Sequence, residues 1–142
     1  MLTAAAVVVC ALELLGRSTS PYPIKLLDQA PPGRSAHVEG FVTRNPDTIY
    51  LITSAPAFRA AQRGRFAHGS YDGCRHVASV IVHEEWHLRH GAGEEDAYLA
   101  QLMTLVTLRA DGSAISSVRR SMRSAVAKEK AGRGQSGAVN GP

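Results

Sequence analysis

The chain has 142 residues, of which 44% are hydrophobic and 20% are charged, and its formal net charge is +4. This length provides for one globular domain with a hydrophobic core, and the composition excludes a disordered, fibrous or disulfide-based protein. From Arg109 onward, seven Lys or Arg residues outnumber two acidic residues, whereas the rest of the chain is close to neutral. A solvated helix face explains this basic excess more simply than a nucleic-acid site does, so nucleic acid is not the expected partner.

Residues 2–15 form an apolar segment, "LTAAAVVVCALELL", which we interpret as a first helix closed by Gly16. The segment lacks a basic start and is too short to cross a bilayer, which requires about 20 residues. We therefore expect a cytoplasmic protein without a transmembrane segment; if residues 2–15 are instead a signal segment, the protein is exported. Cys10 and Cys74 have no CxxC partner, which favours a reducing compartment and argues against a cysteine zinc site.

The β-forming part of the sequence lies between residues 18 and 53. Residues 18–34 are rich in Pro and Ser and predict a loop with one extended segment. The next two runs, "HVEGFVT" at 37–43 and "TIYLIT" at 48–53, favour strands and are separated by the turn formers "RNPD". This arrangement predicts a β-hairpin.

Helical patterns account for most of the remaining chain. The sequence predicts helices over residues 54–62, 74–90, 94–111 and 113–130, with a polar loop over 64–73. Residues 131–142 are too small and polar to pack, so we expect a disordered tail there. The predicted fold is therefore α+β: a mostly helical single domain over residues 1–130, with a small β-hairpin or sheet beside the helix at 74–90.

The stretch "VIVHEEWHLRH" contains an HExxH motif formed by His83, Glu84 and His87. Helical residues four apart lie about 40° apart around the axis and roughly 6 Å apart along it, so both imidazoles can reach one ion. A catalytic zinc site has three protein ligands and a water whose pKa falls to about 7. Glu84, next to the first ligand, can take the proton of that water as it attacks a carbonyl. The motif therefore predicts the chemistry of peptide hydrolysis.

Such a site needs a third protein ligand. His90 lies on the same helix face as His83 but roughly 10 Å further along the axis, too far to share an ion easily. We therefore interpret His90 as a cation at the helix C-terminus and not as a ligand. The turn "GAG" lets the chain reverse, so a carboxylate at the start of the next helix can face the ion. Glu94 and Glu95 both qualify, and the periodicity places Glu95 closer to the centre of the apolar face. The spacing alone leaves this choice open.

Residues 80–102, including "HEEWHLRHGAGEEDAYLAQL", resemble the gluzincin group of metallopeptidases, in particular small bacterial or phage-related proteins of a minimal type. The third ligand of that group commonly opens an E-x-x-A-Y or E-x-x-A-N pattern, which Glu94, Ala97 and Tyr98 match. The resemblance implies a zincin-like fold that binds Zn²⁺ through His83, His87 and Glu94, with Glu84 as general base. Glu85 departs from the pattern, because an uncharged residue usually follows the catalytic glutamate; its helical position predicts a solvent-facing side chain.

Several nearby residues have two plausible roles each. Tyr98 can pack as a core aromatic or donate to a developing oxyanion. Glu95 or Asp96 can orient a ligand imidazole or be solvated. Trp86 is expected in the core. No chemistry is assigned to His37, His68 and His76, which lack ligand spacing.

The predicted function is zinc-dependent hydrolysis of a peptide or protein substrate, by a metallopeptidase of the HExxH type. By analogy with zinc peptidases, residues 48–53 are the candidate strand for binding an extended substrate through its main chain. The alternative is a non-catalytic, metal-stabilised interaction or regulatory module whose basic C-terminal helix holds a partner. A third possibility is nucleic-acid binding through Arg119, Arg120 and Arg123.

Overall fold

The computed structural model describes residues 1–35, 37–63 and 73–139. In these ranges the chain forms, in order, α1 (Ala4–Leu14), β1 (Ile24–Leu27), β2 (Gly40–Thr43), β3 (Thr48–Ile52), α2 (Pro56–Arg63), α3 (Gly73–His90), α4 (Glu94–Thr107) and α5 (Gly112–Val139). The predicted α+β class, with a mostly helical domain and a small sheet, is confirmed. Almost all of the loop predicted over 64–73 lies outside the described residues.

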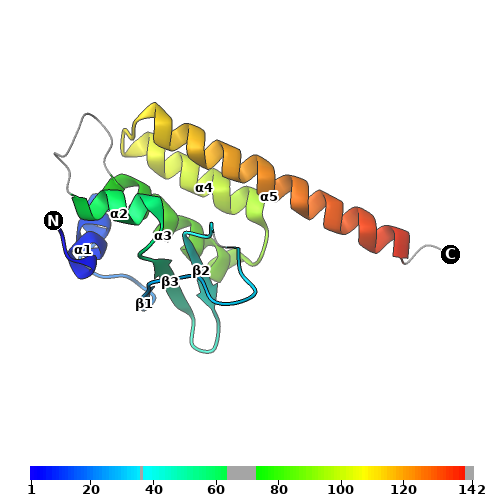
Figure 1. Ribbon diagram of the computed structural model, residues 1–142, viewed down its shortest axis with the longest axis horizontal. Coiled ribbons are helices and arrows are strands. Elements are labelled where there is room, and N and C mark those ends of the chain that lie inside the picture. The colour runs from blue at the N-terminus through cyan, green and yellow to red at the C-terminus, as the bar shows by residue number, and fades with distance from the viewer. Residues whose placement is uncertain (36, 64–72, 140–142) are drawn as a thin grey trace.

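Helix α3 is the central element of the molecule (Figure 1). The sheet, α1, α2 and α4 pack around it, and α5 lies along α4 (Figure 1). The C-terminal part of α5 projects beyond the rest of the fold. Every element that contacts α3 therefore helps to position the HExxH motif that this helix carries.

The sheet has the strand order β1-β3-β2. β1 pairs in parallel with β3, and β2 pairs with β3 in an antiparallel hairpin, as predicted. Because β3 is the central strand, both of its edges are already paired. The prediction that residues 48–53 offer a free edge to a substrate is therefore wrong, and on the hairpin side the free edge belongs to β2.

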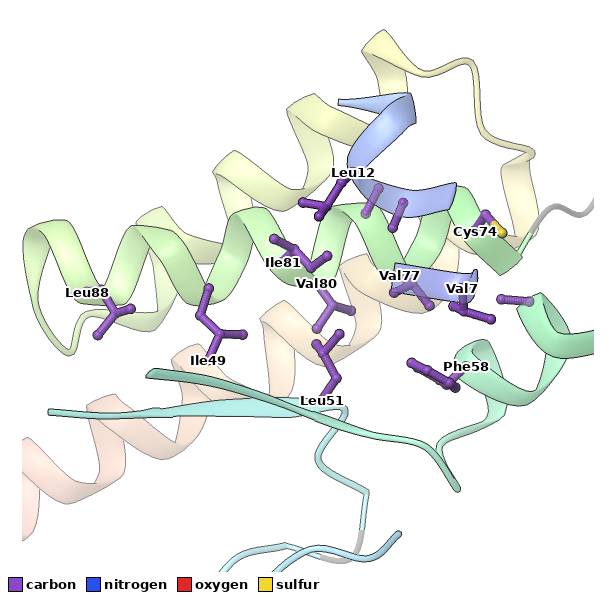
Figure 2. Packing of buried hydrophobic residues seen from close by; sticks show 13 residues of the cluster. Val7, Leu12, Ile49, Leu51, Phe58, Cys74, Val77, Val80, Ile81 and Leu88 are labelled. Atoms are coloured by element: carbon purple, nitrogen blue, oxygen red, sulfur yellow. The ribbon is translucent and has the colours of Figure 1, made fainter. Parts of the chain in front are cut away.

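Apolar side chains from α1, α2, α3 and β3 form the main core (Figure 2). Its most completely buried large members are Val7, Ile49, Leu51, Phe58 and Ile81. Burial of a side chain of this size contributes roughly 1.5–3 kcal/mol. Because most of the α3 residues in this core precede residue 82, the core fixes the N-terminal half of α3. The following turns carry the polar residues of the motif.

Helix α1 ends as predicted at Gly16, whose φ of +73° lies in the left-handed region. The Gly16 N–H donates to Glu13 O and the Arg17 N–H donates to Leu12 O, both at 2.9 Å. These two bonds form a Schellman motif. The motif turns the chain so that the Arg17 side chain reaches Glu85 on α3.

Two other helix ends differ from the prediction. Helix α4 ends at Thr107 instead of near Asp111, because Arg109 takes a left-handed φ of +57° that closes the helix. Helix α5 continues past Lys130 to Val139, into the segment that the sequence predicts to be a disordered tail. None of the helices formed by the described residues combines the length and apolarity needed to cross a membrane.

Candidate metal centre

Two imidazoles and one carboxylate converge where α3 leads into α4. His83 and His87 lie one turn apart on α3, and both are largely buried. Gly91, with a φ of +105°, reverses the chain so that Glu94 at the start of α4 faces them. Within the described residues, these three form the one group of potential ligands found, and their ligand atoms lie within 4.8 Å of one another. We call His83, His87 and Glu94 the metal triad.

The distances within the metal triad fit a tetrahedral ion. Zinc bonds of about 2.0–2.1 Å place the ligand atoms of a tetrahedral site about 3.3 Å apart. His83 Nε2 lies 3.2 Å from His87 Nε2 and 3.7 Å from Glu94 Oε1. His87 Nε2 and Glu94 Oε1 are closer, at 2.5 Å, and have to separate slightly for an ion to bind. Two imidazole nitrogens and one carboxylate oxygen are also a ligand set that zinc accepts.

Hydrogen bonds behind His83 determine which of its nitrogens faces the metal triad. Ser79 Oγ donates to His76 O at 2.6 Å, so it accepts from Gln101 Nε2 at 3.2 Å. The Gln101 amide therefore presents Oε1 to His83 Nδ1, 2.9 Å away, and this nitrogen carries the proton. In the neutral imidazole, the lone pair of Nε2 is left to bind a metal ion.

The backbone orients His87 in the same way. Its Nδ1 donates to Gly91 O at 2.8 Å, which leaves Nε2 facing the metal triad. Arg44, in the turn between β2 and β3, donates to His87 O at 2.8 Å and to Leu88 O at 3.3 Å. A cation on the last carbonyls of a helix complements the helix dipole. Arg44 thus ties the β2–β3 hairpin to the end of α3 that carries the ligands.

The members of the metal triad stabilise one another's charges. Burial raises the pKa of the Glu94 carboxyl, but the two neighbouring imidazoles, His83 and His87, outweigh this effect and lower the pKa to about 2. Burial lowers the pKa of His87, but its hydrogen bonds to Glu94 and to the Gly91 carbonyl leave that pKa above the ordinary value. Glu94 is therefore ionised near neutral pH, which is the form that binds a cation.

Glu84 lies beside the metal triad without belonging to it. The residue is 6% exposed, and it lines the same cleft as the triad. Burial raises the pKa of its carboxyl, partly opposed by the attraction of His83 and His87. A carboxylate with a raised pKa is well suited to accept a proton near neutral pH.

The metal triad lines a cleft of about 750 Å³, which we call the site cleft. Residues 37–42, which include most of β2, form part of its wall. Helix α5 contributes Ser113, Ser117 and Ser121, which repeat at intervals of one helical turn. The volume falls within the range of sites that enclose small organic ligands, so a peptide segment of a few residues can enter.

Tyr98 contacts the metal triad from α4. Its ring lies edge-on to the His83 ring, with the centroids 4.4 Å apart, and it lines the site cleft. Burial raises the pKa of the Tyr98 hydroxyl to about 12, with further contributions from Glu94 and Glu39. The hydroxyl is therefore protonated at neutral pH and can donate a hydrogen bond. Both of its predicted roles, ring packing and donation to an oxyanion, remain compatible with this position.

Glu85 is buried, with 2% of its surface exposed, so the prediction of a solvent-facing side chain is wrong. Its Oε1 forms an ion pair with Arg17 Nη1, and its Oε2 lies 3.5 Å from Arg89 Nη2. Buried charges are tolerated when they are paired. The pairing with Arg17 explains how a charged residue can follow Glu84 in this chain.

The imidazoles are not oriented by the acidic residues that the sequence suggested. Glu95 and Asp96 are exposed on α4, whereas Gln101 and the Gly91 carbonyl contact the two Nδ1 atoms. The sequence reasoning missed Gln101, although a signal was present. Gln101 follows Glu94 by seven residues, so helical spacing places it on the same face of α4.

The other aromatic and imidazole residues named from the sequence take varied positions. Trp86 is only half-buried, contrary to the prediction that it lies in the core, and its ring packs against exposed His90, 4.9 Å away between centroids. Buried His76 pairs with Glu39 at 3.2 Å and lines the site cleft, as does His37. His68 lies outside the described residues.

Comparisons of the chain with known protein families, with curated proteins and with solved structures found no match. The resemblance to gluzincins therefore rests on the motif residues themselves. Those residues, the metal triad with Glu84 and Tyr98, line one cleft. What the protein does has to be inferred from the geometry of this cleft.

Proposed function

We propose that this protein is a zinc-dependent metallopeptidase that hydrolyses peptide bonds in the site cleft. The observation that carries the proposal is the convergence of the metal triad beside a separate buried carboxylate, Glu84. Structural zinc sites are commonly closed by four protein ligands, whereas catalytic sites have three and keep one position for water. Three potential ligands beside a carboxylate with a raised pKa support the catalytic alternative.

Glu84 is the proton carrier of the proposed reaction. A zinc ion held by His83, His87 and Glu94 would lower the pKa of a water to about 7 and polarise the scissile carbonyl. Glu84 accepts one proton of the water as the water oxygen forms a bond to the carbonyl carbon. When the C–N bond breaks, Glu84 gives this proton to the departing nitrogen. The products are a carboxylic acid and an amine, and Glu84 is again a carboxylate.

Tyr98 is the proposed donor to the carbonyl oxygen. Negative charge develops on that oxygen as water adds, and a preplaced donor stabilises it. The Tyr98 hydroxyl keeps its proton because its pKa is raised to about 12, and the residue lines the site cleft beside His83.

The free edge of β2 is the proposed binding surface for the peptide main chain. Ile52 N–H donates to Glu39 O at 3.0 Å, which makes this a hydrogen-bonded pair of the antiparallel ladder. Alternation along the strand then directs the N–H and C=O groups of Gly40 and Val42 away from β3. These groups can pair with an extended substrate, as in β-strand addition.

The proposal is tested by zinc analysis and peptide-library cleavage with wild-type protein and with Glu84→Gln. We expect Glu84→Gln to keep its zinc and to lose cleavage by about 10²–10⁴-fold, which is the usual contribution of general acid–base catalysis. Glu95→Gln is the matched control, because Glu95 is an exposed carboxylate beside Glu94, and it should cleave normally.

Two outcomes contradict the proposal. Full activity of Glu84→Gln would show that Glu84 is not the general base. Wild-type protein that binds zinc stoichiometrically but cuts nothing in a broad peptide pool favours the non-catalytic metal-stabilised module instead.

A further inference from the structure

Helix α5, which packs on α4, carries a regular stripe of buried and half-buried residues that ends in a carboxylate. Ala114 and Val118 are buried, and Met122 and Ala125 are half-buried. Their spacing of four, four and three residues is that of a packing face on a helix. Glu129 continues the stripe four residues further on and is also half-buried. A charged residue in this apolar series needs a partner.

The partner of Glu129 is the first backbone amide of α4. Glu129 Oε1 accepts the Glu94 N–H at 2.9 Å, across 35 residues of sequence. This amide is one of the four N–H groups at a helix start that have no acceptor within their own helix. Gly93, the N-cap residue of α4, supplies no side-chain acceptor of its own.

We propose that Glu129 is a positioning residue for the metal centre: it fixes the backbone of Glu94 so that the Glu94 carboxylate faces His83 and His87. The inference rests on the proposed metal site and goes beyond it, because it assigns α5 a role in metal binding. Hydrogen bonds from a backbone N–H to a carboxylate are charge-assisted and strong. Glu94 donates this bond from its backbone N–H and is also a member of the metal triad, so displacement of its backbone displaces a ligand.

A purely structural role for Glu129 makes a different prediction. If Glu129 only stabilises the start of α4, any other N-cap should replace it. Gly93 has φ −63° and ψ 121°, and a Cβ there has nothing within 4 Å, so Gly93→Ser is accommodated. A serine N-cap bonds the N–H of the second or third helical residue and not that of the first. It therefore restores helix stability without holding Glu94.

The test measures zinc affinity by competition with a chromophoric chelator and records the visible spectrum of the Co²⁺-substituted protein, which reports ligand geometry. We expect Glu129→Ala to bind zinc at least tenfold more weakly, the usual effect of losing a group that supports a ligand, and to change the Co²⁺ spectrum. Glu129→Gln keeps an acceptor oxygen and should remain close to wild type. Lys128→Ala, an exposed neighbour on α5, is the matched control and should equal wild type.

Folding of each variant is checked by circular dichroism and urea unfolding. We expect the double variant Glu129→Ala with Gly93→Ser to recover stability while its zinc affinity and Co²⁺ spectrum stay altered. The positioning role is overturned if the double variant recovers stability together with zinc affinity and the Co²⁺ spectrum. It is also overturned if a folded Glu129→Ala binds zinc as tightly as wild type. These readouts need no catalysis, so wild-type protein that binds metal but cleaves nothing defeats only the peptidase proposal. Wild-type protein that binds no metal overturns both.

Discussion

At the scale of single residues, side chains outside the metal triad hold its members in place. Gln101 fixes the proton on His83 Nδ1 and is itself fixed by Ser79. We expect Gln101→Ala to weaken zinc binding by about 10–100-fold, because His83 loses the partner that selects its tautomer and ring orientation. Gln101→Glu keeps an acceptor and should bind nearly as wild type. Chelator competition measures both, and unchanged affinity in Gln101→Ala contradicts the role.

The ion pair between Arg17 and Glu85 affects the stability of the fold and not metal binding. We expect Arg17→Ala to lower the free energy of unfolding by on the order of 3 kcal/mol, because the Glu85 carboxylate stays buried without its main partner. Arg89→Ala should cost less than about 1 kcal/mol, since Arg89 is largely exposed. Urea unfolding measures both changes. Equal effects of the two variants speak against a dominant role for Arg17.

Residues of the metal centre were predictable where their geometry is local. Helical spacing alone pairs His83 with His87 and places Glu84 beside them, because four residues make about one turn. Arg17 was not predictable as the partner of Glu85, since 68 residues separate them and only the packing of α1 on α3 brings them together. The burial of Glu85 could not be read from the sequence for the same reason.

At the scale of elements, Gly40 allows β2 to lie close to α3. A Cβ on Gly40 would lie 2.8 Å from Tyr50 O and 3.2 Å from Val80 Cγ1. We expect Gly40→Ala to destabilise the fold by roughly 1–3 kcal/mol, as overpacking does, and to shift the β2 edge. Peptide cleavage should then fall more than zinc affinity, because β2 lines the site cleft but carries no ligand. Gly132→Ala, an exposed position on α5 with open space around it, is the control and should not destabilise the fold. Wild-type stability in Gly40→Ala would count against the close packing.

The elements themselves followed from local patterns, but their order in the sheet did not. The hairpin of β2 and β3 and the helices α1, α2 and α3 lie within a few residues of where apolar periodicity and turn residues predict them. β1 is only four residues long, and it pairs with β3 across the whole hairpin. That non-local pairing makes β3 central and moves the free edge on the cleft side to β2.

At the scale of the whole molecule, the core and the metal triad occupy different parts of the fold. The core joins α1, α2, β3 and the N-terminal half of α3, whereas the metal triad lies at the junction of α3 and α4. None of the three triad residues belongs to the main hydrophobic core. We therefore expect the protein to stay folded without metal, unlike small metal-stabilised modules, which unfold when the metal is removed.

Removal of zinc by a chelator should lower the melting temperature without unfolding the protein at room temperature. Zinc at a hundred times its Kd stabilises the folded state by about 2.7 kcal/mol. For a domain of this size, the melting temperature should rise by roughly 10 °C. Thermal unfolding followed by circular dichroism measures the shift, and Glu94→Gln should show a smaller one because the metal triad loses a charged ligand. If the chelated protein has no helical signal at room temperature, the metal is required for folding. The inference that the core forms independently of the metal triad is then wrong.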